Sequence, residues 1–410
     1  MGKNLLVEAL RMNNPKSNRF NCSTDVLSYK TGFTVFDYYL GYLVNVFNEK
    51  NELITQYPSI GITGGCYVCF IGRPSTGKTT MAVQVAANMV RKFDNGSVIH
   101  YDLEKAMNYS RIANLTKFKM MDMKDGKYIL KKDNNSINDI KSAIMQLYME
   151  KTTNQERYTY KTGVLNEFGE EIIAYEPTVV IIDSIPMLSS EVNINNSKEA
   201  AKLEEVSSQT ERMRLTAEIG RFYSELTPYI SEANITVISI NQIKTNPGMG
   251  IVKSPSEILY LKQDEALPGG KAPQFLANIL CKFVAIGSEK YTYEDDGVDG
   301  FGVRLEIIKS RTNQAGQSVN MVYDKIRGMD NIRSNFEYAK ELGMIGGNKN
   351  GYYFTDRKDV KFTRVGMTSE FRANPELYKL MYEHIIPPLK SRLSALRVEE
   401  MDIPDAEFDY

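Results

Sequence analysis

The chain reads Gly72-Arg73-Pro74-Ser75-Thr76-Gly77-Lys78-Thr79 between an apolar run at residues 66–71 and a helical run at residues 80–90. This stretch fits the phosphate-binding pattern G-x-x-x-x-G-K-[ST] in its strand, loop and helix context. The glycines let backbone N–H groups wrap a chain of phosphates, Lys78 reaches the terminal phosphates, and Thr79 can hold Mg²⁺. The helix that starts at about Thr80 adds its positive end. We therefore predict a nucleoside triphosphate site at residues 72–80.

The composition of the 410-residue chain excludes several classes of site. Four cysteines are too few for a disulfide framework, and Cys66 and Cys69 would point to opposite faces of a predicted strand, which argues against a metal or redox pair. Only two histidines, His100 and His384, remain for a zinc site or a histidine triad. The 50 basic and 51 acidic residues nearly balance, so net charge argues neither for nor against a nucleic-acid partner.

The sequence carries no sign of a membrane or export signal. No apolar run reaches membrane-spanning length, and the first residues lack a signal-peptide core and the Ser or Thr of a myristoylation signal. We expect a soluble cytoplasmic protein with no membrane partner.

Strand-like and helical runs alternate from about residue 25 to residue 324. The predicted strands are 66–71, 98–103, 178–183, 236–241, 303–308 and 319–323, and the predicted helices are 80–92, 137–150 and 199–230. This alternation predicts an α/β fold with a mostly parallel sheet and helices on both faces. Two segments interrupt it, a polar, turn-rich one at 45–59 and a hairpin-like one at 158–175. We interpret both as surface additions rather than docking sites.

The length suggests two or more domains, and we divide the chain into four parts. Residues 1–24 form an N-terminal arm with Leu5, Leu6 and Leu10 at helical spacing, a candidate polymerisation element. Residues 25–327 form the α/β core. Residues 328–396 form a small α+β domain, with helices at 335–342 and 375–395 around a strand at 352–354. Residues 397–410 form an acidic tail.

Two strand ends supply the carboxylates that phosphate hydrolysis needs. The apolar strand 178–183 ends in Asp183, which would hold the Mg²⁺ of a bound nucleotide through its water shell. The strand 98–103 leads into Asp102-Leu-Glu104, and we assign Glu104 as the base that orients and deprotonates the attacking water. Either acid could instead cap the following helix, Asp102 especially.

A third strand ends in Asn241-Gln242 and leads into an unusually long loop at 243–273. Gln242 could sense a terminal phosphate and signal to that loop, although Asn-Gln at a strand end is by itself only a polar stop. The loop combines glycines, lysines and apolar residues, namely Gly248, Gly250, Gly269, Gly270, Lys244, Lys253, Lys262, Lys271, Met249, Ile251 and Val252. Such a loop suits a segment that orders on single-stranded DNA. The polar segment 189–214 is a weaker candidate, because it could be one solvated helix face.

Lys309-Ser310-Arg311 follows the predicted strand 303–308 and places two cations on one face of an extended segment. Cations at a strand end usually face solvent. In an oligomeric ATPase of the phosphate-loop type, such a pair can reach a neighbour's γ-phosphate, an effect of roughly 10³–10⁵ in rate for arginine fingers.

Most of the sequence resembles the RecA-type recombinases, most closely the phage recombinases of the UvsX type. The resemblance rests on the phosphate loop and on motifs along the chain, namely Lys30-Thr31-Gly32-Phe33 through Leu40-Gly41, Asp102-Leu-Glu104, Ile240-Asn241-Gln242, Lys309-Ser310-Arg311, Glu341 through Tyr353, and Phe371-Arg-Ala-Asn-Pro375-Glu. It implies a RecA-like P-loop NTPase core, with ATP and Mg²⁺ bound between the subunits of a helical filament on single-stranded DNA. The filament would exchange its strand into a homologous double-stranded DNA.

The same resemblance implies further partners and site residues. Mediator and single-strand-binding proteins would cooperate with the filament, in the cytoplasm of a bacterial host if a phage encodes the chain. Phe275 falls where the family keeps an interface aromatic, and Lys309 and Arg311 match its trans-acting cations. Where the family keeps a tyrosine near the adenine, this chain has Arg111, with Tyr109 close by.

Two other functions share some of these features. A hexameric replicative helicase of the DnaB type uses the same core, but the absence of a sizeable domain before the core and the form of the C-terminal extension favour the recombinase. A non-catalytic ATP-binding recombination regulator is the second alternative, and the retention of Lys78, Thr79, Glu104 and Asp183 argues against it.

Overall fold

The structure, a computed structural model, describes residues 26–133, 136–189, 208–245, 265–270, 272–286, 300–348 and 350–393. The predicted N-terminal arm, residues 190–207 of the polar segment, the middle of the long loop and the acidic tail lie outside these ranges. Within the described ranges, no helix has the length and apolarity needed to cross a membrane.

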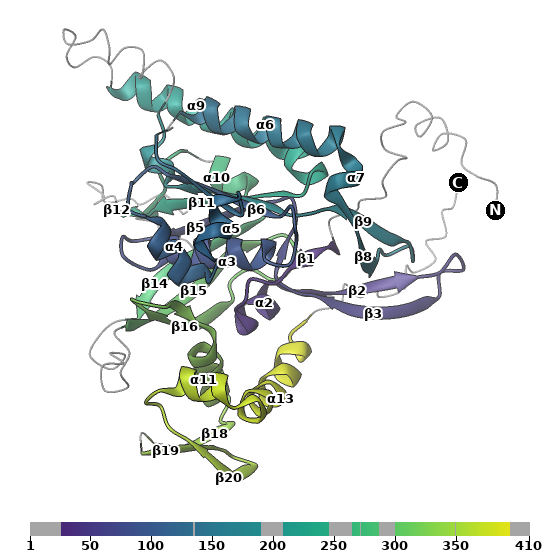
Figure 1. The fold of residues 1–410 in the computed structure, drawn as a ribbon, viewed down its shortest axis with the longest axis vertical. Coiled ribbons are helices and arrows are strands. Elements are labelled where there is room, and N and C mark those ends of the chain that lie inside the picture. Colours follow the sequence, from purple (N-terminus) through teal and green to yellow (C-terminus); the bar gives the residue numbers. More distant parts are fainter. Residues whose placement is uncertain are drawn as a thin grey trace, which may run out of the picture.

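A nine-stranded sheet forms the centre of the larger part of the molecule (Figure 1). Its strand order is β17-β16-β15-β14-β5-β11-β10-β6-β7. The strands from β14 to β7 in this order are parallel neighbours, whereas β15, β16 and β17 join antiparallel to one another and to β14. In chain order their bounds are β5 (Tyr67–Gly72), β6 (Ser97–Asp102), β7 (Tyr128–Lys131), β10 (Thr178–Asp183), β11 (Ile235–Gln242), β14 (Ile279–Ile286), β15 (Gly300–Ser310), β16 (Ser318–Asp324) and β17 (Gly328–Asp330). The predicted mostly parallel α/β sheet is therefore confirmed.

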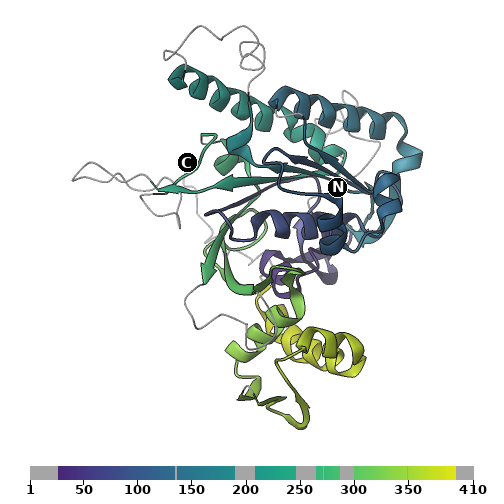
Figure 2. The same cartoon turned by 60° about the vertical axis from the view of Figure 1, so that its left-hand side comes forward.

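Helices cover both faces of this sheet, as predicted (Figures 1 and 2). One layer contains α3 (Lys78–Val90), α4 (Tyr109–Thr116) and α5 (Met120–Lys124), and the other contains α6 (Ile137–Thr153) and α9 (Ser208–Glu232). The alternating side chains of β10 serve the two layers. Val179 and Ile181 pack with the α3 layer, and Val180 and Ile182 pack with the α6 and α9 layer. Each of these buried side chains stabilises the fold by roughly 1.5–3 kcal/mol.

One strand was not predicted, namely β14, which connects the parallel and antiparallel parts of the sheet. The strand is buried on both faces and so lacks the alternation of a half-exposed strand. It also carries Lys282, whose ammonium group lies 2.7 Å from the Glu265 carboxylate. Cys66 and Cys69 belong to separate hydrophobic clusters on opposite sides of β5, as their spacing predicted.

The two interrupting segments are both hairpins, and they contact each other. The prediction for 158–175 is confirmed by β8 (Thr159–Leu165) and β9 (Glu171–Tyr175), which follow the short helix α7 (Gln155–Tyr158). The turn-rich interpretation of 45–59 is wrong, because most of it belongs to a hairpin of β2 (Tyr42–Phe47) and β3 (Leu53–Ser59). The hydroxyl of Tyr57 donates to the carbonyl of Leu165 at 2.6 Å, and Phe47 N donates to Glu167 O at 2.9 Å.

The C-terminal part lies beyond the antiparallel edge of the sheet (Figure 1). It contains α11 (Asn331–Glu341), a three-stranded sheet of β18 (Ile345–Asn348), β19 (Gly351–Phe354) and β20 (Arg357–Phe362), and the helices α12 (Met367–Ala373) and α13 (Pro375–Ser391). Its buried phenylalanines belong to the same hydrophobic cluster as the α3 face of the large sheet. Because β17 pairs with β16, the large sheet extends to Asp330, three residues past the predicted boundary at 327.

An N-terminal segment connects the two parts. It contains β1 (Ser28–Tyr29), which pairs with β4 (Ile62–Thr63), and α2 (Thr34–Leu40). Thr34 N donates to the Asn331 side chain at 2.8 Å, so the motif at residues 30–33 lies against the start of α11.

Candidate functional site

The register of the parallel strands brings the predicted motifs to one edge of the sheet. Gly72, at the end of β5, lies opposite Gln242 of β11. Asp183 of β10 lies opposite Ile240 on one side and Asp102 on the other. Ligands of parallel α/β sheets bind beyond the carboxyl ends of the strands. The phosphate loop and the three polar strand ends are therefore adjacent, as the sequence predicted.

The phosphate loop turns from β5 into α3 through backbone conformations that restrict its sequence. Gly77 has φ +86°, and a Cβ atom there would lie 2.9 Å from Met329 Cε and 3.1 Å from Tyr323 Cδ2. Ser75 has φ +61°, a region that non-glycine residues rarely adopt. Arg73, Pro74 and Ser75 are exposed, whereas the Thr76, Lys78 and Thr80 side chains are buried. Residues 73–75 thus face solvent, whereas the side chains that follow them in the loop and in α3 are held in the protein interior.

Lys78 is a buried cation, and no charged side chain among the described residues is in direct contact with it. Its ammonium group donates to Arg73 O at 2.6 Å, Gly72 O at 3.2 Å and Thr76 Oγ1 at 3.4 Å. Burial lowers the pKa of Lys78 to about 8, against the attraction of Asp183 and Glu104. A phosphate at the loop would supply the missing negative charge.

Thr79 and Asp183 form a donor set suited to a hard divalent cation. The Thr79 hydroxyl donates to Asp183 Oδ2 at 2.8 Å. Asp183 is buried, and its Oδ1 has no hydrogen-bond partner among the described residues. An orphaned carboxylate oxygen beside a threonine hydroxyl fits Mg²⁺, which prefers oxygen ligands and keeps part of its water shell. The two residues predicted as metal ligands are thus in contact.

Two residues behind Asp183 were not predicted. His100 is fully buried, and its Nε2 lies 3.8 Å from Asp183 Oδ2, too far for a hydrogen bond. Its Nδ1 lies 2.9 Å from the Tyr128 hydroxyl on β7. The sequence analysis considered histidine only for zinc or a triad. The position of His100 near Asp183 could have been predicted, because His100 lies on the same face of its strand as Asp102 and this strand pairs with β10.

Glu104 lies where three strand ends meet. Its Oε1 accepts hydrogen bonds from Ser184 Oγ at 2.5 Å and from Gln242 Nε2 at 3.1 Å. Its backbone is also fixed, because Leu103 N and Glu104 N donate to Asp183 O at 2.7 and 3.3 Å. The carboxylate is exposed and is held beside the end of β10 by these contacts.

Asp102 has the structural role that the sequence analysis left open. Its two oxygens accept from Ala106 N at 3.0 Å and Met107 N at 2.8 Å. It therefore caps the turn after β6 and not the helix itself, because Asn108 caps α4 by accepting from Arg111 N at 2.8 Å.

Arg111 and Tyr109, which were predicted to lie near the adenine of the nucleotide, form hydrogen bonds with different parts of the chain. The Arg111 guanidinium donates to Ile326 O at 2.8 Å, in the turn between β16 and β17. The Tyr109 hydroxyl accepts from Leu130 N at 3.3 Å, on the outer strand β7. Tyr323 is an aromatic side chain beside the phosphate loop that was not predicted, since its ring lies close to Gly77. Its position at the end of a predicted strand was the available signal.

Asn241 joins the same site to the far end of the long loop. Its amide Nδ2 donates to Pro268 O at 2.8 Å. Part of the predicted loop has regular structure, because β12 (Lys244–Thr245) pairs with β13 (Glu265–Ala266) at its base and α10 (Ala272–Leu276) follows. Gly269 and Gly270 have positive φ and pack near Ile185, in the 3₁₀ turn η2 (Ile185–Met187), and Thr216. The other predicted DNA contacts, Met249, Gly250, Ile251, Lys253 and Lys271, lie outside the described residues.

Lys309 and Arg311 lie away from the phosphate loop of their own chain. Lys309 is the penultimate residue of β15 and not beyond the strand as predicted. It lies opposite Leu280, which pairs with Cys69, three residues before Gly72, or about 10 Å along the strand. Arg311 lies farther along in the same direction. The Lys309 ammonium donates to Phe275 O at 2.5 Å, and Phe275 itself is 46% exposed.

No protein-family model and no curated protein matches this chain.

The structure brings together the phosphate loop, Thr79, Asp183, Glu104 and Gln242, and it separates Lys309 and Arg311 from them.

Proposed function

We propose that the protein is a DNA-dependent ATPase with a RecA-like P-loop core, which forms helical filaments on single-stranded DNA and exchanges strands with a homologous duplex. One observation carries the proposal. Gln242 is hydrogen-bonded to the predicted catalytic base, while its neighbour Asn241 is hydrogen-bonded to the loop predicted to bind DNA. A nucleotide-dependent change at the strand end would therefore reach both.

In this proposal the phosphate loop holds ATP through its backbone N–H groups and Lys78, and Thr79 and Asp183 hold Mg²⁺. The ion, when bound, supplies positive charge against the phosphate oxygens. Glu104 takes a proton from a water whose oxygen bonds to the γ-phosphorus. The bond from that phosphorus to the bridging oxygen of ADP breaks, and the proton leaves with the phosphate product. Ser184 and Gln242 hold the Glu104 carboxylate for this step.

The coupling to DNA uses the two neighbouring amides at the end of β11. A γ-phosphate near Gln242 would compete for its Nε2 and so change the hydrogen bond to Glu104. The backbone shift would pass to Asn241, which holds the return of the loop through Pro268. Glycines at 269 and 270, both with positive φ, give this return the freedom to move.

The filament supplies the remaining charge in trans. Lys309 donates to the carbonyl of the exposed Phe275, and Arg311 lies two residues farther from the phosphate loop, where its N–H donates to Asn278 O. An adjoining subunit in a head-to-tail filament would bring its Lys309 and Arg311 to the γ-phosphate. Mediator and single-strand-binding proteins are the expected further partners, and the cytoplasm is the expected location.

The test compares the natural protein with Glu104→Gln and with the matched exposed variant Glu376→Gln on α13. We expect Glu104→Gln to keep ATP and DNA binding but to lose about 10²–10⁴ of its turnover, since it removes the base. Phosphate release with single-stranded DNA measures turnover, and strand exchange between labelled oligonucleotides measures the activity. Equal DNA affinity with and without ATP would contradict the proposal. Closed rings instead of filaments by electron microscopy would favour a helicase.

A further inference from the structure

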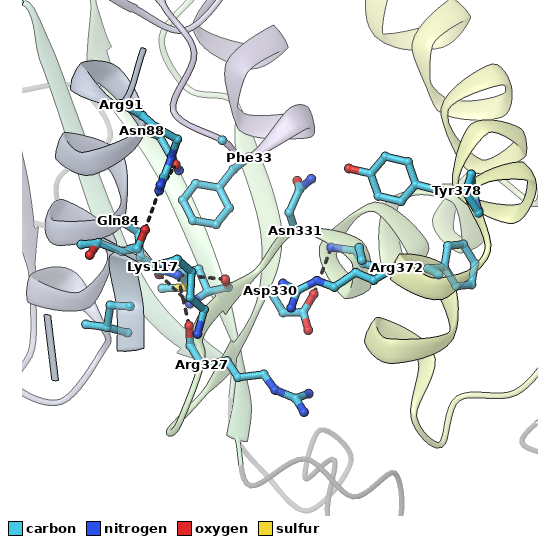
Figure 3. A pocket seen from close by; sticks show the side chains of 17 residues that line it. Phe33, Gln84, Asn88, Arg91, Lys117, Arg327, Asp330, Asn331, Arg372 and Tyr378 are labelled. Atoms are coloured by element: carbon cyan, nitrogen blue, oxygen red, sulfur yellow. Dashed lines mark hydrogen bonds between the residues drawn. The ribbon is translucent and has the colours of Figure 1, made fainter. Parts of the chain in front are cut away.

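A cavity of about 580 Å³ lies between the core and the C-terminal part (Figure 3). Its walls come from the outer face of α3, the motif at residues 32–33, the end of α4, the turn from Arg327 into α11, and the helices α12 and α13. Gln84, on the α3 wall, lies six residues after Lys78, or about 9 Å along the helix. Met329, which lines the cavity and also lies beside Gly77, divides the cavity from the phosphate loop. The inference does not depend on the proposed ATPase activity.

Four cations from both sides line this cavity, namely Arg91, Lys117, Arg327 and Arg372. Figure 3 shows Arg91 and Lys117 on the core side and Arg372 on the C-terminal side. Arg91 donates only to neutral oxygens, Thr116 O at 2.6 Å and Asn88 Oδ1 at 3.2 Å. Within the described part of the chain, none of the four cations forms an ion pair.

The polar groups between these cations are already engaged. Asp330, the one carboxylate in the lining, accepts from Ile332 N at 3.0 Å and Arg333 N at 3.1 Å, and its other oxygen accepts from the Thr368 hydroxyl. The Asn331 amide is bonded to Thr34 N, and the Gln84 amide to Met329 N at 2.9 Å. Among the described residues, the one carboxylate of the wall is therefore already bound by three donors, and the four cations leave the wall a net positive charge, which favours an anion of two or more charges.

We propose that this cavity binds a phosphate group. Arginine is the residue best suited to phosphate, because its planar guanidinium offers paired donors to two phosphate oxygens, and three of the four cations are arginines. The volume lies within the range of small-molecule sites. The phenyl ring of Phe33 and the phenol of Tyr378 add aromatic wall for an attached organic group (Figure 3). The phosphate could belong to a free phosphorylated molecule or to the phosphodiester backbone of DNA.

The test separates this site from the phosphate loop by using Lys78→Ala as the parent. Arg327→Gln/Arg372→Gln removes two charges from the cavity, and both residues are exposed. Lys358→Gln/Lys361→Gln removes two charges from exposed positions on β20, outside the cavity, and is the matched control. Lys117→Asn is a second cavity variant, because Lys117 has φ +60° and asparagine tolerates that conformation. Circular dichroism and thermal melting confirm folding of each variant.

Pyrophosphate and a short DNA duplex are titrated separately by calorimetry. We expect the parent to bind one of them, and the double cavity variant to bind it at least about tenfold more weakly, because charge-assisted hydrogen bonds are lost. Lys117→Asn should weaken it in the same direction, and the control should stay within about twofold of the parent. Pyrophosphate binding that follows this pattern assigns a free phosphate, and duplex binding alone assigns the DNA backbone. Absence of both, or an equal loss in the control, overturns the proposal.

Discussion

Nucleotide binding should weaken as the pH rises from 7.5 to 9.5, because Lys78 loses its proton in the unliganded protein. Burial lowers the pKa of Lys78 to about 8, and its three hydrogen bonds reach only uncharged oxygens. A bound polyphosphate favours the ammonium form, so the pKa of Lys78 in the complex should return at least to its ordinary value of 10.5. Binding then takes up a proton above pH 8, and affinity must fall as protons become scarce.

The size of the effect follows from these two pKa values. The dissociation constant should be about 20-fold larger at pH 9.5 than at pH 7.5, and the number of protons taken up should rise from about 0.2 at pH 7.5 to about 0.9 at pH 9. Calorimetry with ADP in buffers of different ionisation enthalpy measures both quantities. The phosphates of ADP are essentially fully ionised in this range, since their last pKa is about 6.

Lys78→Arg is the control, because arginine keeps its charge throughout this pH range. Its ADP affinity should change by less than about twofold between pH 7.5 and 9.5. The stability of the unliganded natural protein relative to that of Lys78→Arg should rise as the pH increases from 8 to 10.5, because over this range Lys78 is deprotonated in the folded chain and protonated in the unfolded chain. A flat affinity profile for the natural protein would refute the reasoning, as would a slope that persists in Lys78→Arg.

Three further predictions test the surrounding contacts. Lys309→Ala and Arg311→Ala should each lower ATP hydrolysis in the filament by at least about tenfold, while the monomer still binds ADP. Steady-state phosphate release measures the hydrolysis and calorimetry measures the ADP binding. Full turnover in both variants would show that the pair does not act at the site. Asn241→Ala should reduce the dependence of single-stranded DNA affinity on ATP, because it removes the hydrogen bond to Pro268. Fluorescence anisotropy measures the DNA affinity with and without ATP, and a ratio of the two affinities equal to that of the natural protein would show that the coupling does not use this bond. His100→Phe should raise the Mg²⁺ concentration needed for half-maximal nucleotide binding severalfold, because a nonpolar ring replaces the imidazole behind Asp183, and an identical Mg²⁺ titration would contradict this role.

The parts of the site that the sequence predicted are those that depend on chain order and strand direction. The phosphate loop, Asp183, Glu104 and Gln242 each follow an apolar run of strand length, and parallel strands place their carboxyl ends together. Hydrophobic periodicity and the right-handed crossover of parallel strands are enough to predict this arrangement. The 158–175 hairpin was predictable from its alternating pattern around a turn, and the helices on both faces were predictable from the alternation of strand-like and helical runs.

The contacts that the sequence could not give are those between segments far apart in the chain. Tyr323 meets Gly77 across more than two hundred residues, and His100 reaches Asp183 only because β6 pairs with β10. The hairpin of β2 and β3 was missed because its exposed strand β3 carries Gln56 and Pro58 and shows little apolar alternation. β14 was missed because a strand buried on both faces shows none.

The pairing of Asn241 and Gln242 shows how a local rule becomes a functional one. Neighbouring residues of a strand point to opposite faces, so one amide of this pair can reach Glu104 while the other reaches Pro268. Exchanging the order of these residues would send the longer glutamine side chain toward Pro268 and leave asparagine, which is one methylene shorter, facing Glu104. The Gln242 contact is already 3.1 Å long, so the shorter amide would fall out of hydrogen-bond range. Order and side-chain length at this strand end thus link the base to the loop, and neither residue alone could make both contacts.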